Sequence, residues 1–255
     1  MTELFGLNAR HALVTGASSG LGRHFAGVLA TGGARVSVTA RREMALATTV
    51  ESIRASGGHA HAVRMDVTDA ASVEQAFAAA EAEFGPVGIV INNAGVTGTR
   101  PALDMTDDDW TSVIDTNLKG GWVVARHAAR RMIHHGQSGS IVNIASILGV
   151  RVAGGVAPYA ISKAGVVQMT KALALEWARH KIRVNALAPG YIETDLNDEF
   201  FASDAGKALI RRIPQRRLGQ ARELDGALLL LASDAGSYMT GSVIAVDGGH
   251  LVSGL

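Results

Sequence analysis

The chain of 255 residues has the length and composition of one large soluble domain, with 47% hydrophobic and 18% charged residues, which argues against disorder. Its net charge of +1 provides no strong field for nucleic acid or an anionic membrane surface, so neither is an expected partner. The lack of cysteine excludes disulfides and thiolate metal sites, and it suits a reducing cytoplasm.

The first residues of the chain predict neither a signal peptide nor a membrane anchor. Residues 1–8 carry an early acidic residue and lack the basic start and long apolar stretch of an export signal. The longest apolar runs, such as 227–232, are far too short to cross a bilayer. We therefore expect a cytoplasmic protein that does not enter the membrane.

Short β-rich runs alternate with longer helical patterns along the whole chain. We predict strands over 11–15, 35–39, 61–65, 88–92, 140–145, 182–187 and 242–246, and helices near 20–32, 42–56, 69–84, 107–135, 159–180 and 221–232. The strands are almost continuously apolar, which predicts burial on both faces, and the helices between them predict right-handed crossovers. The expected fold class is α/β: a single Rossmann-like domain over 1–255. Its doubly wound parallel sheet has about seven strands, with helices on both faces.

The first predicted strand leads into a glycine-rich turn that reads Thr15-Gly16-Ala17-Ser18-Ser19-Gly20-Leu21-Gly22 and opens a helix. Glycines allow a tight turn and a close approach of the backbone to a phosphate, while the helix N-terminus offers free N–H groups and a positive dipole end. A glycine cluster alone could be only a turn. Its position directly after a buried strand favours a dinucleotide site.

A second motif places Tyr159 four residues before Lys163 in a helical pattern. This spacing puts both side chains on the same helix face, so the ammonium group can lie beside the phenol. A neighbouring cation lowers the pKa of a phenol, and a phenol tuned in this way can act as a general acid or base near neutral pH. Taken by itself, the spacing could equally be a coincidence on a helix surface.

The chain resembles the short-chain dehydrogenase/reductase family in a set of motifs that occur over essentially its whole length, in the family's order and spacing. They are the glycine turn from Gly16 to Gly22, Asn92-Asn93-Ala94-Gly95, Asn117, Ser146, Tyr159 with Lys163, and Pro189-Gly190. Within the family the resemblance is to β-ketoacyl-carrier-protein reductases and to members like gluconate 5-dehydrogenase.

This resemblance implies a catalytic set of four residues, Asn117, Ser146, Tyr159 and Lys163. Tyr159 would be the general acid/base at a carbonyl or alcohol oxygen, and Lys163 would lower its pKa and hold the nicotinamide ribose. Ser146 would donate a hydrogen bond to the same oxygen as negative charge develops there. Asn117 would hold a water that links Lys163 to solvent. The alternatives are a kink asparagine for Asn117 and a strand-end hydroxyl for Ser146.

The resemblance also implies a nicotinamide cofactor that carries the hydride chemistry. The residues expected to bind it are Gly16, Ser18, Ser19, Gly20, Leu21, Gly22, Arg41, Arg42, Asp66, Val67, Asn93, Ala94, Gly95, Tyr159, Lys163, Pro189, Gly190, Ile192 and Thr194. Asp66 would contact the adenine, although a helix-capping role competes with that interpretation. Asn92 is expected near the adenine-side ribose.

The end of the second predicted strand bears on the choice between NAD and NADP. It reads Val38-Thr39-Ala40-Arg41-Arg42, without the carboxylate that would favour NAD by accepting from the ribose hydroxyls. Arginine pairs well with phosphate, so Arg41, with help from Arg42, favours NADP(H). Against this, Ser18 or Ser19 stands where many NADP-using relatives carry a basic residue. NAD therefore remains the alternative.

A variable segment at about 195–217 is expected to fold over the substrate as a lid. Arg211, Arg212, Arg216 and Arg217 form a basic cluster that either meets an anionic substrate or lies on a solvated or subunit-facing surface. Apolar residues after Ser146 and in the segment predict a mostly apolar pocket wall: Ile147, Leu148, Val152, Val156, Phe200, Phe201, Leu209 and Ile213. Candidate substrates are a β-ketoacyl thioester, a small ketone or a sugar acid, interconverted between ketone and secondary alcohol. The alternative function is a catalytically silent NADP-binding scaffold or sensor.

No metal site is expected. Thr106 is a candidate N-cap, and the acidic run that follows at 107–109 suits a helix start, where the dipole favours carboxylates. The nine histidines show no metal-ligand spacing. The segments 107–135 and 159–180 are apolar on more than one face, and family members pair these helices across a twofold axis, so the resemblance implies a homotetramer.

Overall fold

The computed structural model describes residues 2–194 and 198–253, which contain a sheet of seven parallel strands in the order β3-β2-β1-β4-β5-β6-β7. The strands are β1 (His11–Thr15), β2 (Arg35–Ala40), β3 (His59–Arg64), β4 (Ile89–Asn92), β5 (Gly139–Ile144), β6 (Ile182–Pro189) and β7 (Val243–Val246). The α-helices of the described part are α1 (Thr2–Phe5), α2 (Gly20–Thr31), α3 (Glu43–Ala55), α4 (Ala70–Phe84), α5 (Asp107–Ile114), α6 (Gly121–His134), α7 (Ala157–Trp177), α8 (Asp198–Ala202), α9 (Asp204–Ile210) and α10 (Asp225–Ala232). None of the helices among these residues is long and apolar enough to span a membrane.

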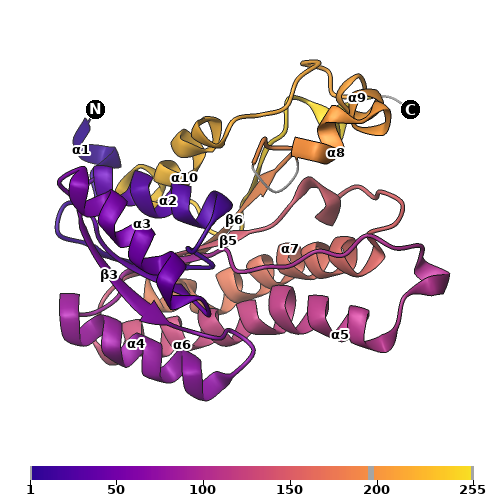
Figure 1. The fold of residues 1–255 in the computed structure, drawn as a ribbon. Helices are drawn as coiled ribbons and strands as arrows, with labels where there is room; N and C mark the ends of the chain where they lie inside the picture. The colour runs from indigo at the N-terminus through magenta and orange to yellow at the C-terminus, as the bar shows by residue number, and fades with distance from the viewer. Residues whose placement is uncertain (1, 195–197, 254–255) are drawn as a thin grey trace.

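Helices cover both faces of the sheet, as predicted for a doubly wound fold (Figure 1). Helices α2, α3 and α10 pack on one face, and α4, α6 and α7 pack on the other. Every residue of β1, β4 and β5 is buried, which explains why these strands read as continuous apolar runs rather than alternating ones. Each valine, leucine or isoleucine fully buried in this way contributes about 1.5–3 kcal/mol.

The order of the strands reverses beside β1, since β2 lies on one side of it and β4 on the other. Loops that leave the carboxyl ends of β1 and β4 therefore turn to opposite faces and leave a crevice between them, where open α/β sheets bind ligands. The Thr15 hydroxyl ties the two loops together, because it accepts hydrogen bonds from the backbone N–H groups of Asn93 and Ala94, at 3.0 and 2.9 Å. The glycine turn and the Asn93–Gly95 segment are thus fixed next to each other.

The predicted helix over 107–135 is not one continuous α-helix. A π-helical segment at Asp115–Gly120 separates α5 from α6. The N-terminal end of α5 agrees with the sequence, because Thr106 and Asp109 form a capping box. A π-helical turn is a short irregularity within an otherwise α-helical run and is often found at functional sites, and the coarse apolar pattern of the sequence did not predict it here. Asn117 lies in this segment.

Candidate active site

The glycine turn has a backbone that only glycine fits well at two positions. Gly16 has φ of +66°, and a Cβ there would lie 2.9 Å from the Ala94 Cα. A Cβ on Gly22 would overlap the Gly16 carbonyl oxygen and lie 2.5 Å from the Asn93 amide nitrogen. The turn therefore packs closely against the loop after β4. It leads into α2 at Gly20, and the first N–H groups of this helix have no partner within the helix. This is the arrangement that accepts a phosphate.

A groove runs from this turn along the carboxyl ends of the strands. Its first part is a cavity of 420 Å³ lined by thirteen of the residues predicted to bind cofactor, namely Gly16, Ser18, Ser19, Gly20, Leu21, Gly22, Arg41, Arg42, Asp66, Val67, Asn93, Ala94 and Gly95. Its second part is a cavity of 320 Å³ that includes Ser146, Tyr159, Lys163, Pro189, Gly190, Ile192 and Thr194. The two cavities share Gly20, Leu21, Asn93, Gly95 and Val96, so they form one continuous groove.

Tyr159 and Ser146 meet at the second end of the groove. Tyr159 lies in the first turn of α7, and Ser146 follows β5 and caps a short 3₁₀ turn by accepting from the Leu148 N–H at 3.1 Å. Burial raises the pKa of the Tyr159 phenol, a hydrogen bond with Ser146 opposes that shift, and the nearby Tyr191 adds to it. The two hydroxyl groups therefore converge on one place, where both can donate to a single oxygen.

Lys163 lies beneath the Tyr159 ring, with its Nζ 5.6 Å from the ring centroid. The ammonium group is buried and donates to the Ile144 carbonyl oxygen at 2.8 Å. Burial lowers the pKa of Lys163 to about 8. The predicted face-sharing of the two side chains is present, but the predicted lowering of the Tyr159 pKa is not. Burial of the phenol is the largest influence on this pKa.

Asn117 connects the loop after β4 to α7. Its Oδ1 accepts from the Val96 N–H at 2.7 Å, and its Nδ2 donates to the Val96 carbonyl at 2.9 Å and to the Ser162 Oγ at 3.1 Å. Ser162 is the residue before Lys163 and donates in turn to the Tyr159 carbonyl at 2.7 Å. Asn117 therefore positions the helix that carries Tyr159. The water relay expected at Asn117 stays a prediction.

Arg42 reaches over the glycine turn. Its Nη2 donates to the Ser18 and Ser19 hydroxyls, at 3.1 and 3.3 Å. Arg41 lines the same cavity and lies within electrostatic range of Asp66. The two serines that stand in place of a basic residue thus have a guanidinium group directly above them. Arg41 and Arg42, which supply basic charge at this end of the groove, directly follow β2 and lie outside the glycine turn.

Comparisons with known proteins identify the family. Residues 16–250 match the family model described as enoyl-(acyl carrier protein) reductase. The chain is 39% identical to the gluconate 5-dehydrogenase of Gluconobacter oxydans strain 621H over 98% of each protein. It is also 39% identical to the 3-oxoacyl-(acyl-carrier-protein) reductase of Escherichia coli K12, over 93% of this chain and 96% of the relative. The chain belongs to the short-chain dehydrogenase/reductase family.

A solved structure gives the same result for the fold. The gluconate 5-dehydrogenase of Burkholderia cenocepacia J2315, in complex with NADP and tartrate, superposes on 99% of this chain with a TM-score of 0.95 at 37% identity, and 99% of that chain is covered. As a short-chain dehydrogenase/reductase, the protein is an oxidoreductase that interconverts a ketone and a secondary alcohol. The Rossmann-like fold predicted from the sequence is confirmed.

The structure corrects the prediction for Asn92 in this dehydrogenase/reductase and agrees with the groove position predicted for Asp66. Asn92 was expected near the adenine-side ribose, but it is buried and donates to the Gly121 carbonyl at 2.8 Å and the Asn143 Oδ1 at 3.1 Å. It holds β4 to α6 and β5, and it lines neither part of the groove. Asp66 does line the groove and is not the helix cap that competed with this role, because Asp69 caps α4.

The variable segment contains α8 and α9, which are drawn above α7 in Figure 1. Residues 195–197 of the expected lid lie outside the described residues. Leu209, Ile147, Leu148 and Val152 line a further cavity of 370 Å³, as expected for a pocket wall, and Val156 does not. The same cavity is lined by Tyr191, Arg151 and His250, which sequence reasoning did not assign. Tyr191 directly follows the Pro189-Gly190 motif and Arg151 lies between Ser146 and Tyr159, whereas His250 is close in sequence to none of the predicted site residues.

The basic cluster of the short-chain dehydrogenase/reductase divides into residues with different surroundings. Arg217 is paired with Glu223 through two hydrogen bonds of 2.7 Å each, which lowers the pKa of Glu223 to about 2. Arg211 and Arg216 are exposed. Arg212 lines the 370 Å³ cavity. All four arginines are exposed, and Arg212 differs from the others in lining this cavity as well.

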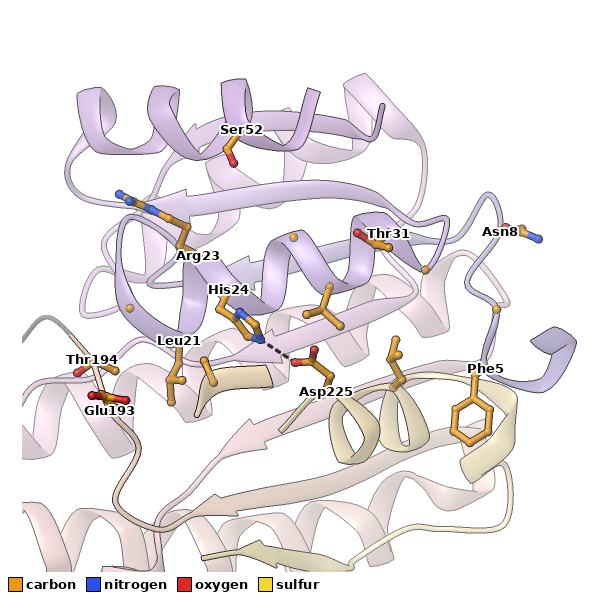
Figure 2. Close-up of a pocket in the computed structure, with 17 residues that line it drawn as sticks. Phe5, Asn8, Leu21, Arg23, His24, Thr31, Ser52, Glu193, Thr194 and Asp225 are labelled. Carbon is orange, nitrogen blue, oxygen red and sulfur yellow. Dashed lines mark hydrogen bonds and ion pairs between the residues drawn. The ribbon is translucent and has the colours of Figure 1, made fainter. Parts of the chain in front are cut away.

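A separate cavity of 1190 Å³ is not lined by the predicted catalytic residues of this dehydrogenase/reductase. It is an open groove between α2, α10 and the N-terminal segment, where His24 and Asp225 are paired at 2.6 Å (Figure 2). It touches the cofactor groove only at Gly20, Leu21 and Thr194. Within the residues that the structure describes, no group of three histidine, aspartate or glutamate side chains is placed to hold a metal ion.

Proposed function

We propose that the protein uses NADP(H) and that Tyr159 is the general acid/base of its ketone–alcohol interconversion. The convergence of the Tyr159 and Ser146 hydroxyls at the end of a groove that begins at a phosphate-binding turn carries this proposal. A reduced nicotinamide supplies a hydride to a carbonyl carbon. What this chain must then supply is a place for the oxygen and a proton for it.

The residues present fit such a cofactor at each position along the groove. The glycine turn and the first N–H groups of α2 would hold the pyrophosphate, and Arg41 and Arg42 would hold the 2′-phosphate. Asp66 and Val67 would contact the adenine, while Ile192 and Thr194 would hold the carboxamide end. The Burkholderia cenocepacia relative was solved with NADP, which supports NADP(H) over NAD(H) here.

The site residues act on the oxygen of the substrate as a pair of donors. Ser146 donates a hydrogen bond that stabilises the developing negative charge, and Tyr159 donates the proton that completes the alcohol. The raised pKa keeps the phenol protonated at neutral pH, which is the form required in the direction of reduction. Lys163, with its pKa lowered to about 8, loses and regains a proton close to physiological pH and would help to reprotonate the tyrosine.

The test is the substitution Tyr159→Phe, which removes the hydroxyl and keeps the ring. We expect a loss of turnover of about 100-fold or more, since general acid/base catalysis contributes about 10²–10⁴-fold, while NADPH binding measured by fluorescence stays within a factor of about two. The panel should contain small ketones, keto acids and β-ketoacyl thioesters, each with NADPH and NADH.

The matched control for that experiment is Tyr238→Phe, because Tyr238 is fully exposed and lines none of the cavities described above. Its turnover should equal that of the unmodified protein. Comparable activity in the Tyr159→Phe protein would overturn the assigned role. NADPH binding without turnover of any carbonyl compound by the unmodified protein would favour the silent scaffold.

We also propose that four copies of the chain associate through α7 and the α5–α6 region. Large apolar side chains are exposed on these helices: Trp110, Trp122, Ile161 and Leu175. Exposed apolar groups gathered on two neighbouring helices are typical of an association surface. The cytoplasmic location stays a prediction of the sequence.

A further inference from the structure

The 370 Å³ cavity adjoins the catalytic end of the groove. Tyr191 lines both, and Ile147 and Leu148 in its wall directly follow Ser146. Tyr191 lies close enough to Tyr159 to raise the pKa of that phenol. Arg151, in turn, lies close enough to Tyr191 for its charge to oppose the rise that burial causes in the pKa of Tyr191. A molecule of a few carbon atoms can therefore reach from the Tyr159 hydroxyl into this cavity.

The ionisable side chains that line the cavity, apart from the Tyr191 phenol, are basic. They are Arg151, Arg212 and His250, and the described lining contains no aspartate or glutamate. The Arg151 Nη1 donates hydrogen bonds to two neutral acceptors, the His250 carbonyl and, at 2.9 Å, the Ser253 hydroxyl. Arg212 has no hydrogen-bond acceptor and no carboxylate partner for its side chain in the described part of the chain. Two guanidinium groups thus face one cavity without a counter-charge.

His250 adds a buried polar side chain to the wall of this cavity. Its side chain is buried, its ring lies 5.5 Å from that of Tyr191, and among the described residues its Nδ1 has no hydrogen-bond partner. Burial lowers the pKa of His250, and Arg151 and Arg212 lower it further, so both guanidinium groups lie near the ring. The Asp247 carboxylate opposes this shift in the pKa of His250, and it already accepts from the Gly249 and Leu251 N–H groups at 2.9 and 2.7 Å.

We propose that this cavity binds a carboxylate of the substrate through Arg151 and Arg212, so that the substrate is a hydroxy acid and its keto acid. The proposal rests on the proposed function, which places the reacting carbon at Tyr159. The carboxylate of the same substrate would then lie beyond Tyr191. Arginine binds carboxylate through parallel N–H donors, and such charge-assisted bonds are about twice as strong as neutral ones. An uncharged ketone would leave both guanidinium groups without a counter-charge.

The experiment measures binding of tartrate by calorimetry to the full chain, with and without NADP⁺, against tartramide as the uncharged probe of the same shape. We expect tartrate to bind at least tenfold more tightly than tartramide. The substitutions Arg212→Gln and Arg151→Lys should each weaken tartrate at least tenfold and leave tartramide unchanged, because loss of one charge-assisted hydrogen bond reduces affinity by about tenfold or more.

Arg211→Gln is the matched control, since it removes a neighbouring exposed arginine that does not line the cavity. Arg212→Gln is the decisive variant, because this exposed side chain holds no other part of the described chain in place. Turnover gives a second readout: KM for D-gluconate should rise in Arg212→Gln with kcat nearly unchanged, whereas a neutral ketone should show no change.

Equal affinities of tartrate for Arg212→Gln and the unmodified protein would overturn the proposal, as would equal binding of tartrate and tartramide. The proposed function fails in a different way. If tartrate binding depends on Arg212 but no carbonyl compound is turned over, then the anion site stands and the assigned chemistry falls.

Discussion

Arg42 illustrates how a charge reaches the cofactor groove from a neighbouring strand. The residue lies just beyond β2, and its guanidinium group extends to Ser18 and Ser19 above the glycine turn. Both hydroxyls can exchange this bond for one to water, so a phosphate could replace them as the acceptor at little cost. The pair Arg41 and Arg42 therefore provides positive charge where the 2′-phosphate of NADP would lie.

Arg41→Ala and Arg42→Ala should each weaken NADPH by about tenfold or more and NADH by less than about threefold, because a charge-assisted hydrogen bond to phosphate is worth about 1.5–3 kcal/mol. Dissociation constants from fluorescence titration measure both effects. Arg64→Ala is the control, as Arg64 is an exposed arginine at the end of β3 that does not line the groove. Equal losses for the two cofactors would count against phosphate recognition.

At the scale of elements, β1 is held in the sheet by a buried histidine as well as by its backbone. His11 is 3% exposed, its Nδ1 lies 2.7 Å from the Gly85 carbonyl, and its Nε2 lies 2.9 Å from the Ser37 hydroxyl. These bonds join β1 to β2 and to the turn after α4. The neutral ring satisfies both partners, and burial lowers the pKa of His11 below its ordinary 6.5.

Because the folded pKa of His11 lies below the unfolded one, the unfolded chain takes up a proton first as the pH falls. The contribution of His11 to the free energy of unfolding is fully present above pH 6.5 and is lost as the pH falls from there toward the folded pKa. We expect a slope of at most about 1.4 kcal/mol per pH unit from this residue, measured by urea unfolding between pH 7 and 5.

His11→Gln should be less stable at pH 7 and should show a smaller decrease on acidification. The control His134→Gln changes an exposed histidine at the end of α6 and should keep the slope of the unmodified protein. An unchanged slope in His11→Gln would show that other groups, such as His127, whose pKa burial also lowers, dominate this pH range.

At the scale of the whole molecule, α7 serves the sheet and the surface at once. It buries Val166, Leu173 and Ala174, yet it exposes 84% of Leu175 and 49% of Ile161. A helix this long with apolar groups on both sides is incompletely covered in one copy of the chain. A second copy that packs on the exposed face would bury those side chains.

Sedimentation velocity at micromolar concentration should therefore give the mass of four chains of 26.5 kDa each. Leu175→Glu should shift the distribution toward smaller species, since it places a charge in the proposed contact at a cost of several kcal/mol. Lys171→Glu, on the same helix, tests whether any added acid has this effect. A monomer for the unmodified protein would refute the assembly.

The sequence determined the family, the fold class and the residues along the cofactor groove, because these residues lie in short motifs of consecutive or nearly consecutive positions. The glycine turn, Asn93–Gly95, Ser146 and Pro189–Gly190 each follow a buried strand, and parallel strands bring their carboxyl ends to one edge. Predicted strand positions agree with the structure to within a few residues for the same reason. Valine, isoleucine, leucine and alanine recur in every strand, although polar residues interrupt them in β2, β3 and β6.

Only the tertiary structure decided the features that depend on burial and on distant contacts. The pKa of Tyr159 moves upward because the fold desolvates the phenol, although its neighbour in sequence is a cation. Arg151, Arg212 and His250 share one cavity because β5, β6 and β7 lie side by side and bring the segments that follow them together. No periodicity links residues so far apart, since their meeting depends on the order of strands in the sheet.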